Sequence, residues 1–348
     1  MQTVIRIVDE NCIDEKIMEE AGELLKSGAL VAFPTETVYG LGANALDEKA
    51  SARIYAAKGR PSDNPLIIHI ADMESLGLIT EEIPKAAYLL AEKFWPGPLT
   101  MVMKKSKVVP YGTTGGLDTV AVRMPSHPIA LEMIRYGGGY IAAPSANTSG
   151  RPSPTLASHV ADDMDGIIPM ILDGGAVGIG IESTIVDLTE DIPTILRPGF
   201  ITKEMLEEVV GEVQIDKGLS GDAKTPPKAP GMKYRHYAPK AELIIVEGAR
   251  DSVVKKINEL TAVNQEKGIV TGVIGTKETV SNYDAKIVKS MGTRNDELSI
   301  SSHLYSILRE FDESDAQMIY SESFEEGAMG SAIMNRLLKA AGHKIIHA

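Results

Sequence analysis

Two cations, Lys58 and Arg60, stand between the end of an expected helix and a tight polar turn. That turn contains Asn64 and leads into a short apolar strand that includes His69. A guanidinium binds phosphate oxygens as a planar fork and an ammonium binds them as a point charge. The stretch therefore favours a phosphate-rich ligand, although a solvated helix end remains an alternative explanation for the two cations.

Three more polar segments lie beside expected strands: residues 34–42, 144–153 and 182–184. Arg123 and Arg197 stand at the ends of two further strands. Polar loops next to strands tend to share one mouth of an α/β sheet, where ligand sites usually form. We expect a single site built from the four loops. The alternatives without a ligand are that His69 is a buried core histidine and that the two arginines form structural ion pairs.

Covalent catalysis is disfavoured by the sequence around Ser145. No base lies near this serine in the chain, and its Ala-Pro-Ser-Ala context is not a nucleophile elbow. The glycine-rich residues 174–180 match neither the P-loop nor the dinucleotide fingerprint, so we expect an ordinary loop there. No carboxylate cluster marks an all-protein metal site, and any Mg²⁺ is expected to arrive with phosphates.

The elements that must position these groups follow from hydrophobic pattern and turn residues. In the first part of the chain we expect strands at 31–33, 66–70, 99–103, 119–124, 140–143, 185–187 and 195–197, and helices at 47–58, 85–94 and 128–135, the first of them capped by Asp47. Later, strands at 242–246, 268–274 and 318–320 alternate with helices at 251–261, 301–311 and 331–341. This alternation is typical of a doubly wound α/β module.

Composition narrows the class of protein. A length of 348 residues suggests two domains, and 43% hydrophobic with 24% charged residues is ordinary for a globular chain. The net charge of −13 argues against a broad nucleic-acid surface. No apolar run is long enough for a membrane span, and the N-terminus does not look like a signal peptide. Since Cys12 is the only cysteine, an internal disulfide is excluded, and we expect a cytoplasmic protein.

A linker is expected between the two domains. Residues 217–240 are rich in glycine, proline and lysine, yet they contain the aromatic and basic run Tyr234 to Tyr237. We predict a first domain over residues 1–213, a linker that acts as a lid over 214–240, and a second domain over 241–348.

The polar motifs, taken together, resemble the YrdC (YwlC) family. They lie at residues 33–45, 58–66, 95–100, 122–125, 143–150 and 183–187, and residues 229–239 resemble the linker of the long form of the family. The resemblance covers essentially the whole chain. It implies a twisted mixed sheet with helices in the first domain, and a smaller Rossmann-like α/β domain after the linker.

The resemblance also implies an activity, the synthesis of threonylcarbamoyl-AMP (L-threonylcarbamoyladenylate) from L-threonine, bicarbonate or CO2, and ATP, with release of pyrophosphate. A separate threonylcarbamoyl transferase would then modify tRNAs that read ANN codons, so stable tRNA binding is not expected. Mg²⁺ would enter with ATP. By the same resemblance, L-threonine would be bound by Thr37, His69, Arg123, Ala143 and Ser183. ATP would be bound by Arg60, Asn64, Thr119, Ser145, Asn147, Ser153, Arg197 and, from the linker, Tyr234 or Arg235, with Lys58 and Arg60 as the catalytic cations.

Two other classes of function stay open. The first domain could bind double-stranded RNA or serve in ribosome maturation, in which case binding would depend steeply on salt and require more cations than this region contains. A regulatory nucleotide sensor would bind ATP without turnover. Pyrophosphate release that depends jointly on threonine and bicarbonate separates the three.

Overall fold

The computed structural model describes residues 2–220, 237–324 and 327–348. These residues form two compact units, which are described separately. Residues 150–152 and 179–181 group with the second unit, although they precede most of it in the sequence. None of the described helices combines the length and the apolar character needed to cross a membrane.

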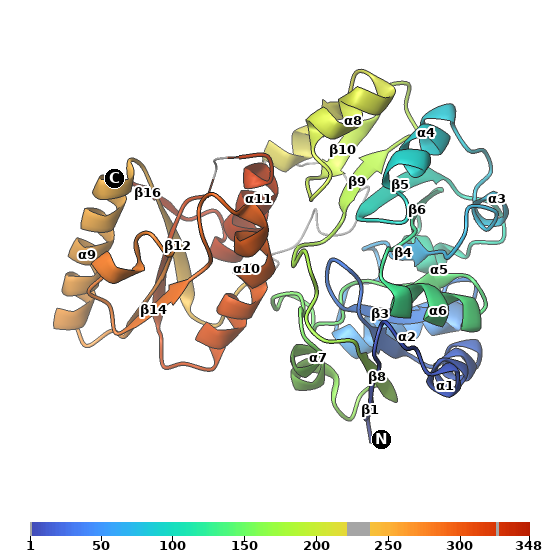
Figure 1. Cartoon of the computed structure of the whole chain (residues 1–348), viewed down its shortest axis with the longest axis horizontal. Helices are drawn as coiled ribbons and strands as arrows, with labels where there is room; N and C mark the ends of the chain where they lie inside the picture. Colours follow the sequence, from blue (N-terminus) through green and yellow to red (C-terminus); the bar gives the residue numbers. More distant parts are fainter. Residues whose placement is uncertain (1, 221–236, 325–326) are drawn as a thin grey trace. The chain divides into compact units, whose positions relative to one another are not determined.

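The first unit is built on an 11-stranded mixed sheet, in the order β1-β8-β2-β3-β7-β4-β6-β5-β9-β10-β11 (Figure 1). Its strands are β1 Val4–Ile7, β2 Val31–Phe33, β3 Gly40–Asn44, β4 Ile67–His69, β5 Leu99–Lys104, β6 Thr119–Arg123, β7 Ile141–Ala142, β8 Met170–Asp173, β9 Thr184–Asp187, β10 Thr194–Arg197 and β11 Gln214–Ile215. Because β11 pairs with β10, this sheet continues two residues beyond the domain end expected at 213.

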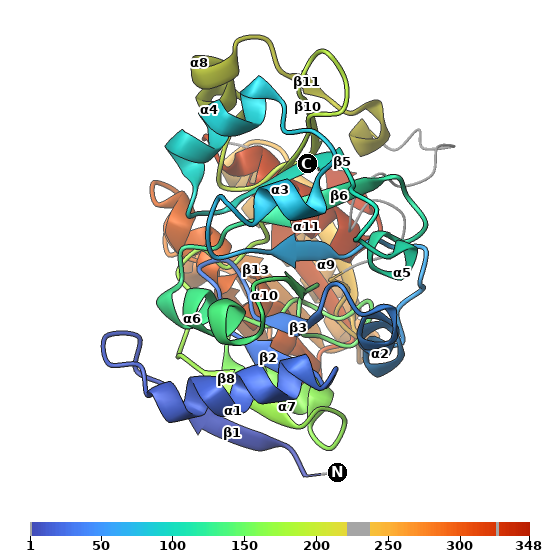
Figure 2. The same ribbon diagram turned by 90° about the vertical axis from the view of Figure 1, so that its right-hand side faces the viewer.

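Helices cover both faces of this sheet. They are α1 Glu15–Lys26, α2 Glu48–Lys58, α3 Leu76–Ile79, α4 Lys85–Phe94, α5 Tyr111–Thr114, α6 Pro128–Tyr136, α7 Ala157–Met164 and α8 Lys203–Val210. Alternation along β2 explains the layering, since successive side chains of a strand point to opposite faces. Val31 and Phe33 belong to one core cluster with residues of α1 and α6, which lie side by side in Figure 2, whereas Ala32 belongs to another cluster that contains residues of α2, α4 and α7.

Helix α2 ends where the cationic stretch begins. The Asp47 side chain accepts a hydrogen bond from Lys49 N at 2.9 Å, which confirms the predicted N-cap. At the other end, Gly59 adopts the left-handed conformation, with φ of 61°, which a side chain would disfavour. The helix therefore stops directly after Lys58, and the chain turns toward β4.

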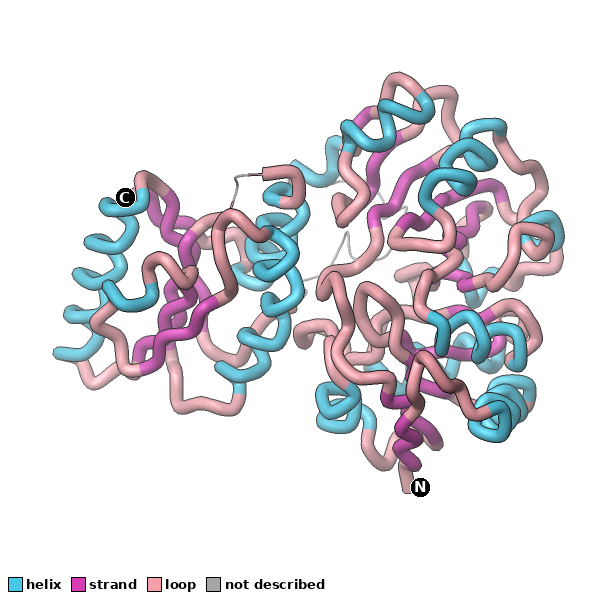
Figure 3. The backbone as a smooth tube through the Cα atoms, in the orientation of Figure 1, coloured by secondary structure: helices cyan, strands magenta, loops and turns pink. Residues whose placement is uncertain are grey.

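The second unit is a five-stranded parallel sheet in the order β14-β13-β15-β12-β16. Its elements are β12 Glu242–Glu247, α9 Arg250–Glu266, β13 Thr271–Gly275, β14 Ile287–Ser290, α10 Glu297–Asp312, β15 Met318–Glu322, α11 Gly330–Ala341 and β16 Ile345–His347. Figure 3 shows the alternation of helix and strand in this unit. The predicted combination of a mixed sheet domain and a smaller Rossmann-like domain is confirmed, although β14 and β16 were not foreseen.

Candidate active site

Three neighbouring strands place the centre of the site. In the parallel pair β4–β6, His69 stands opposite Arg123, and in the antiparallel pair β4–β7 it stands opposite Ile141. Ala143, just after β7, donates its backbone N–H to Ile67 O at 2.9 Å. His69 and Arg123 thus share one level of the sheet, and Ala143 lies beside Ile67, two residues further back along β4.

Arg123 is buried and held from several sides. Its Nη1 donates to Thr37 Oγ1 at 2.9 Å and its Nε to Gly97 O at 3.4 Å. Its Nη2 lies 2.6 Å from Glu36 Oε1. The loop between β2 and β3 therefore reaches across to the end of β6, and a guanidinium fixed in this way can receive a carboxylate.

A second arginine continues this row of polar groups. Arg123 stands opposite Thr100 on β5, whose hydroxyl lies 2.8 Å from Ser183 Oγ. Arg197 donates to Ser183 twice, from Nε to its carbonyl at 3.0 Å and from Nη2 to its hydroxyl at 3.1 Å. The structure therefore brings the residues that were predicted to bind threonine into one continuous region: Thr37, His69, Arg123, Ala143 and Ser183.

His69 is a neutral imidazole in this setting. Its Nδ1 lies 3.2 Å from Ile67 O, and since a carbonyl can only accept, Nδ1 carries the proton. Burial and, after it, the nearby Arg123 charge together lower the pKa of His69 to about 3. The ring also meets Phe33 edge-on, with centroids 6.1 Å apart. His69 is thus a core histidine in its packing, yet it lies opposite Arg123, the arginine predicted to bind threonine.

Lys58 is buried, at 2% exposure, because its ammonium joins two loops. Its Nζ donates to Ser145 O at 2.5 Å and to Asn147 O, and the Ser145 hydroxyl donates to Asn147 Oδ1 at 2.5 Å. The backbone of Lys58 also accepts from Ser149 N. The predicted phosphate cation thus fixes the loop that carries two predicted ATP residues, Ser145 and Asn147.

Arg60, Asn64 and Thr119 lie at the other end of the same strands. Arg60 Nη2 donates to Pro65 O at 3.2 Å. Since Ile67 pairs with Ala121, the register carried back two residues sets Pro65 beside Thr119. Four residues of extended chain separate Pro65 from His69, a span of about 13 Å. Arg60, Asn64 and Thr119 therefore lie at the opposite end of β4 from His69, whereas Arg197, also a predicted nucleotide contact, lies beside Ser183 at the His69 end.

The four polar loops are connected, as expected from the sequence. Loop 34–42 meets loop 144–153 through Leu41 N to Pro144 O and Ala146 N to Tyr39 O, and Lys58 joins the latter to loop 58–64. Ser153 Oγ donates to Glu182 Oε1 at 2.6 Å, which joins loop 182–184. Tyr234 and Arg235 lie outside the described residues.

Sequence reasoning missed three polar side chains in this region: Glu36, Thr100 and Glu182. Glu36 stands between two threonines directly after a buried strand, a signal that was available but unspecific. Thr100 and Glu182 are recognisable only through the strand register and the partner that each one meets. In the described ranges, no three His, Cys, Asp or Glu side chains lie close enough together to hold a metal ion.

Comparisons with known proteins define the class. Residues 23–199 match the Sua5_yciO_yrdC family, whose description reads "Telomere recombination", and residues 201–342 match the family described as "Threonylcarbamoyl-AMP synthase, C-terminal domain". The fold and the site are thus those of a two-domain enzyme with a YrdC-like first domain. The chain belongs to the threonylcarbamoyl-AMP synthase family, which confirms the resemblance seen in the motifs.

Individual relatives match this chain over nearly its whole length. The threonylcarbamoyl-AMP synthase of Pyrococcus abyssi is 54% identical, with 99% of each chain covered, and that of Bacillus subtilis is 50% identical, with 98% of each covered. The solved structure of Pyrococcus abyssi Sua5 complexed with L-threonine is 52% identical, with a TM-score of 0.95 and coverage of 99% of this chain and 100% of that one.

Proposed function

We propose that this enzyme makes L-threonylcarbamoyl-AMP from L-threonine, bicarbonate or CO2, and ATP, and releases pyrophosphate. The observation that carries the proposal is the two-ended arrangement along β4. Arg123, with hydroxyl and imidazole groups, lies at one end, and the loops with Lys58 and Arg60 lie at the other. An amino acid requires the first set of groups, and a nucleotide requires the second. The L-threonine complex of the Pyrococcus abyssi relative supports the amino-acid end.

The reaction needs no covalent enzyme intermediate. The neutral amine of threonine attacks CO2, forms the N–C bond and loses a proton to solvent, which gives a carbamate. A carbamate oxygen then attacks the α-phosphorus of ATP, and the bond from that phosphorus to pyrophosphate breaks. Catalysis of such a transfer consists chiefly of alignment and neutralisation of charge.

Each side chain has a role that its contacts permit. Arg123 binds the threonine carboxylate, while Thr37, Ser183 and neutral His69 suit its hydroxyl. Arg60 neutralises phosphate charge, with Asn64, Thr119, Ser153 and Arg197 as further nucleotide contacts. Lys58 acts by holding Ser145 and Asn147 in place, since its ammonium already binds their carbonyls. Mg²⁺, when present, is carried by the ATP phosphates and adds positive charge there.

The product has a defined use in this proposal. A separate threonylcarbamoyl transferase consumes the adenylate to modify adenosine in tRNAs that read ANN codons, in the cytoplasm. The acidic net charge of −13 fits a protein that does not itself hold tRNA. The linker residues Tyr234 and Arg235 remain predicted nucleotide contacts.

Pyrophosphate release tests the proposal directly. We expect release only when threonine, bicarbonate and ATP are all present, and we expect Arg60→Ala or Lys58→Ala to lower it by roughly tenfold or more. Lys49→Ala is the matched control, because Lys49 is exposed on the same helix as Lys58. Release without threonine, or unchanged release from both variants under saturating substrates, would contradict the proposal.

A further inference from the structure

Glu36 forms an ion pair with Arg123, the arginine expected to bind the substrate carboxylate, and the sequence alone assigns Glu36 no function. Its Oε1 lies 2.6 Å from Arg123 Nη2, and its Oε2 accepts from Ser126 N at 3.2 Å. The Glu36 side chain is 15% exposed, whereas that of Arg123 is 5% exposed. The carboxylate is therefore the more accessible member of the pair.

The contact between these two side chains is an ion pair without hydrogen-bond geometry. Glu36 Oε1 and Arg123 Nη2 are both buried, and neither has a hydrogen-bond partner among the residues that the structure describes. The other donors of Arg123 are anchored on Thr37 and Gly97. Charge thus holds Glu36 in place, while the directional bonding capacity of Nη2 remains unused.

A ligand carboxylate would form better hydrogen bonds with Arg123 Nη2 than Glu36 does. An arginine offers its N–H groups in the plane of the guanidinium, and a carboxylate that approaches in this plane makes short, strong hydrogen bonds. A buried guanidinium also needs a counter-charge at all times, because an unpaired buried charge is costly. Two ionised carboxylates on one guanidinium repel each other. Ligand and Glu36 therefore compete for Arg123.

We propose that Glu36 is an exchangeable counter-ion, which neutralises Arg123 in the empty site and is displaced when the carboxylate of the amino-acid substrate binds. The inference rests on the proposed function, since it requires L-threonine to bind at Arg123. Glu36 is then a positioning residue that sets the affinity for the substrate carboxylate. The exchange also keeps the Arg123 guanidinium paired with a negative charge before substrate arrives.

The test compares wild-type enzyme with Glu36→Gln by calorimetric titration. The probes are L-threonine, (R)-3-hydroxybutyrate, which lacks the amine, and L-threoninol, which lacks the carboxylate. Removal of the competing charge should tighten binding of the first two about tenfold, which corresponds to about 1.4 kcal/mol. L-Threoninol should gain nothing. In steady-state assays, KM for threonine should fall while KM for ATP stays the same.

Other outcomes overturn the inference in distinguishable ways. Weaker binding of L-threonine and L-threoninol, with 3-hydroxybutyrate unaffected, would mean that Glu36 holds the substrate ammonium instead. Unchanged affinities in the variant would mean that Glu36 does not compete. Absence of L-threonine binding by the wild-type enzyme would refute the proposed function itself.

Two controls keep the test decisive. Glu10→Gln removes an exposed carboxylate 3.8 Å from His127 and should leave all three affinities unchanged. If Glu36→Gln does not fold, a structure of the wild-type enzyme with L-threonine decides the matter. The substrate carboxylate should then contact Arg123 Nη2 with Glu36 Oε1 more than about 4 Å away. An intact Glu36 contact in that complex would refute the exchange.

Discussion

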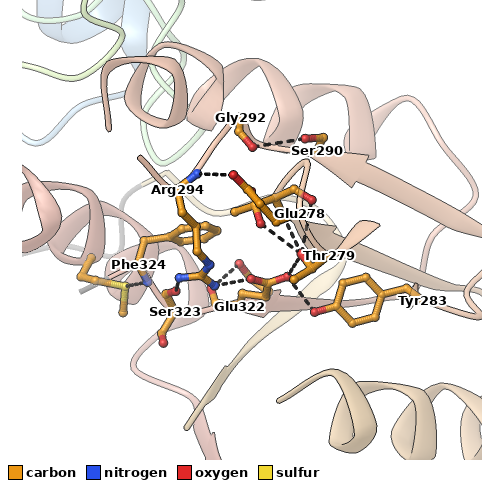
Figure 4. Close-up of polar contacts among 12 residues, drawn as sticks. Glu278, Thr279, Tyr283, Ser290, Gly292, Arg294, Glu322, Ser323 and Phe324 are labelled. Atoms are coloured by element: carbon orange, nitrogen blue, oxygen red, sulfur yellow. Dashed lines mark hydrogen bonds and ion pairs between the residues drawn. The ribbon is translucent and has the colours of Figure 1, made fainter. Parts of the chain in front are cut away.

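Each unit of the molecule contains an arginine–glutamate ion pair with one buried member, Arg123 in the first unit and Glu322 in the second, and the two pairs differ in how fully they are bonded. In the second unit, Glu322 ends β15 and is 1% exposed. It accepts from the hydroxyls of Thr279 and Tyr283 and from Arg294 Nη2, so both of its oxygens are used (Figure 4). In the first unit, the contact between Glu36 and Arg123 satisfies charge alone.

The difference indicates what each pair is for. Burial, followed by the Glu322 charge, raises the pKa of Tyr283, so the phenol stays protonated and donates. Arg294 also donates to Ser323 O and lies over the Phe324 ring. The pair in the second unit therefore joins the loops after β13, β14 and β15 into a fixed network. The pair in the first unit is free to exchange partners.

The largest expected effect is on stability and comes from Glu322→Gln. Removal of the carboxylate charge leaves Arg294 without its counter-charge, and the amide NH2 replaces one acceptor oxygen that now receives hydrogen bonds. Loss of one partner from a buried pair costs about 3–5 kcal/mol of unfolding free energy. Denaturant unfolding followed by far-UV circular dichroism measures the loss. A cost under about 1 kcal/mol would show that the network does not stabilise this unit.

Asp315→Asn serves as the matched control for that variant. Asp315 also pairs with a cation in the second unit, Lys286, but both side chains are largely exposed, at 59% and 61%. Solvent screens such a pair, so unfolding should be unchanged within error. A large loss in this control would mean that charge removal alone, irrespective of burial, explains the Glu322 result.

Glu36→Gln should cost less stability than Glu322→Gln. The variant leaves the buried Arg123 without its counter-charge but breaks no hydrogen bond to it, so we expect a loss of about 3 kcal/mol, the lower end of the range for a buried pair. Trp95 is the only tryptophan in the chain and is buried in the first unit, so its fluorescence reports the unfolding of that unit. Equal losses in the two variants would remove the distinction between a fixed pair and an exchangeable one.

A smaller effect should appear in the pH dependence of stability, through His69. Its folded pKa of about 3 lies below the unfolded value near 6.5, so the unfolded state binds the extra proton as pH falls below 6.5. Stability contributed by neutral His69 is therefore complete above pH 6.5 and lost toward pH 3, by about 1.4 kcal/mol per pH unit. In His69→Gln, the slope of the unfolding free energy against pH, measured by Trp95 fluorescence, should correspond to about one proton fewer taken up on unfolding. Identical slopes would contradict the burial of a neutral imidazole.

Local signals in the sequence predicted several elements well. Asp47, Lys58 and Gly59 give helix α2 a cap, a last turn and a left-handed stop, and the helix has those bounds. Helix α4 spans the predicted residues 85–94. Strand β14, whose residues are all half-buried, lacks the apolar run that identifies a buried strand, and it was missed. Its pairing depends on β13 beside it.

The site was predictable in its residue types but not in its pairings. Motifs around Lys58, Arg123 and Ser183 identified the loops, because ligand-binding groups concentrate in polar turns beside buried strands. The contact between Glu36 and Arg123 joins residues far apart in the chain and depends on how the loop between β2 and β3 meets the end of β6. Sequence spacing contains no information on that placement, so neither the pair nor its poor geometry could be foreseen.

The burial of Lys58 makes its side chain a chemical reporter. An amine reagent in solvent cannot reach an ammonium that is 2% exposed and enclosed by the carbonyls of Ser145 and Asn147, whereas it modifies exposed lysines such as Lys49 at once. Modification of Lys58 must wait until the loop after β7 opens. The labelling rate of Lys58, followed by mass spectrometry, therefore measures how often that loop opens by local unfolding, without any engineered probe.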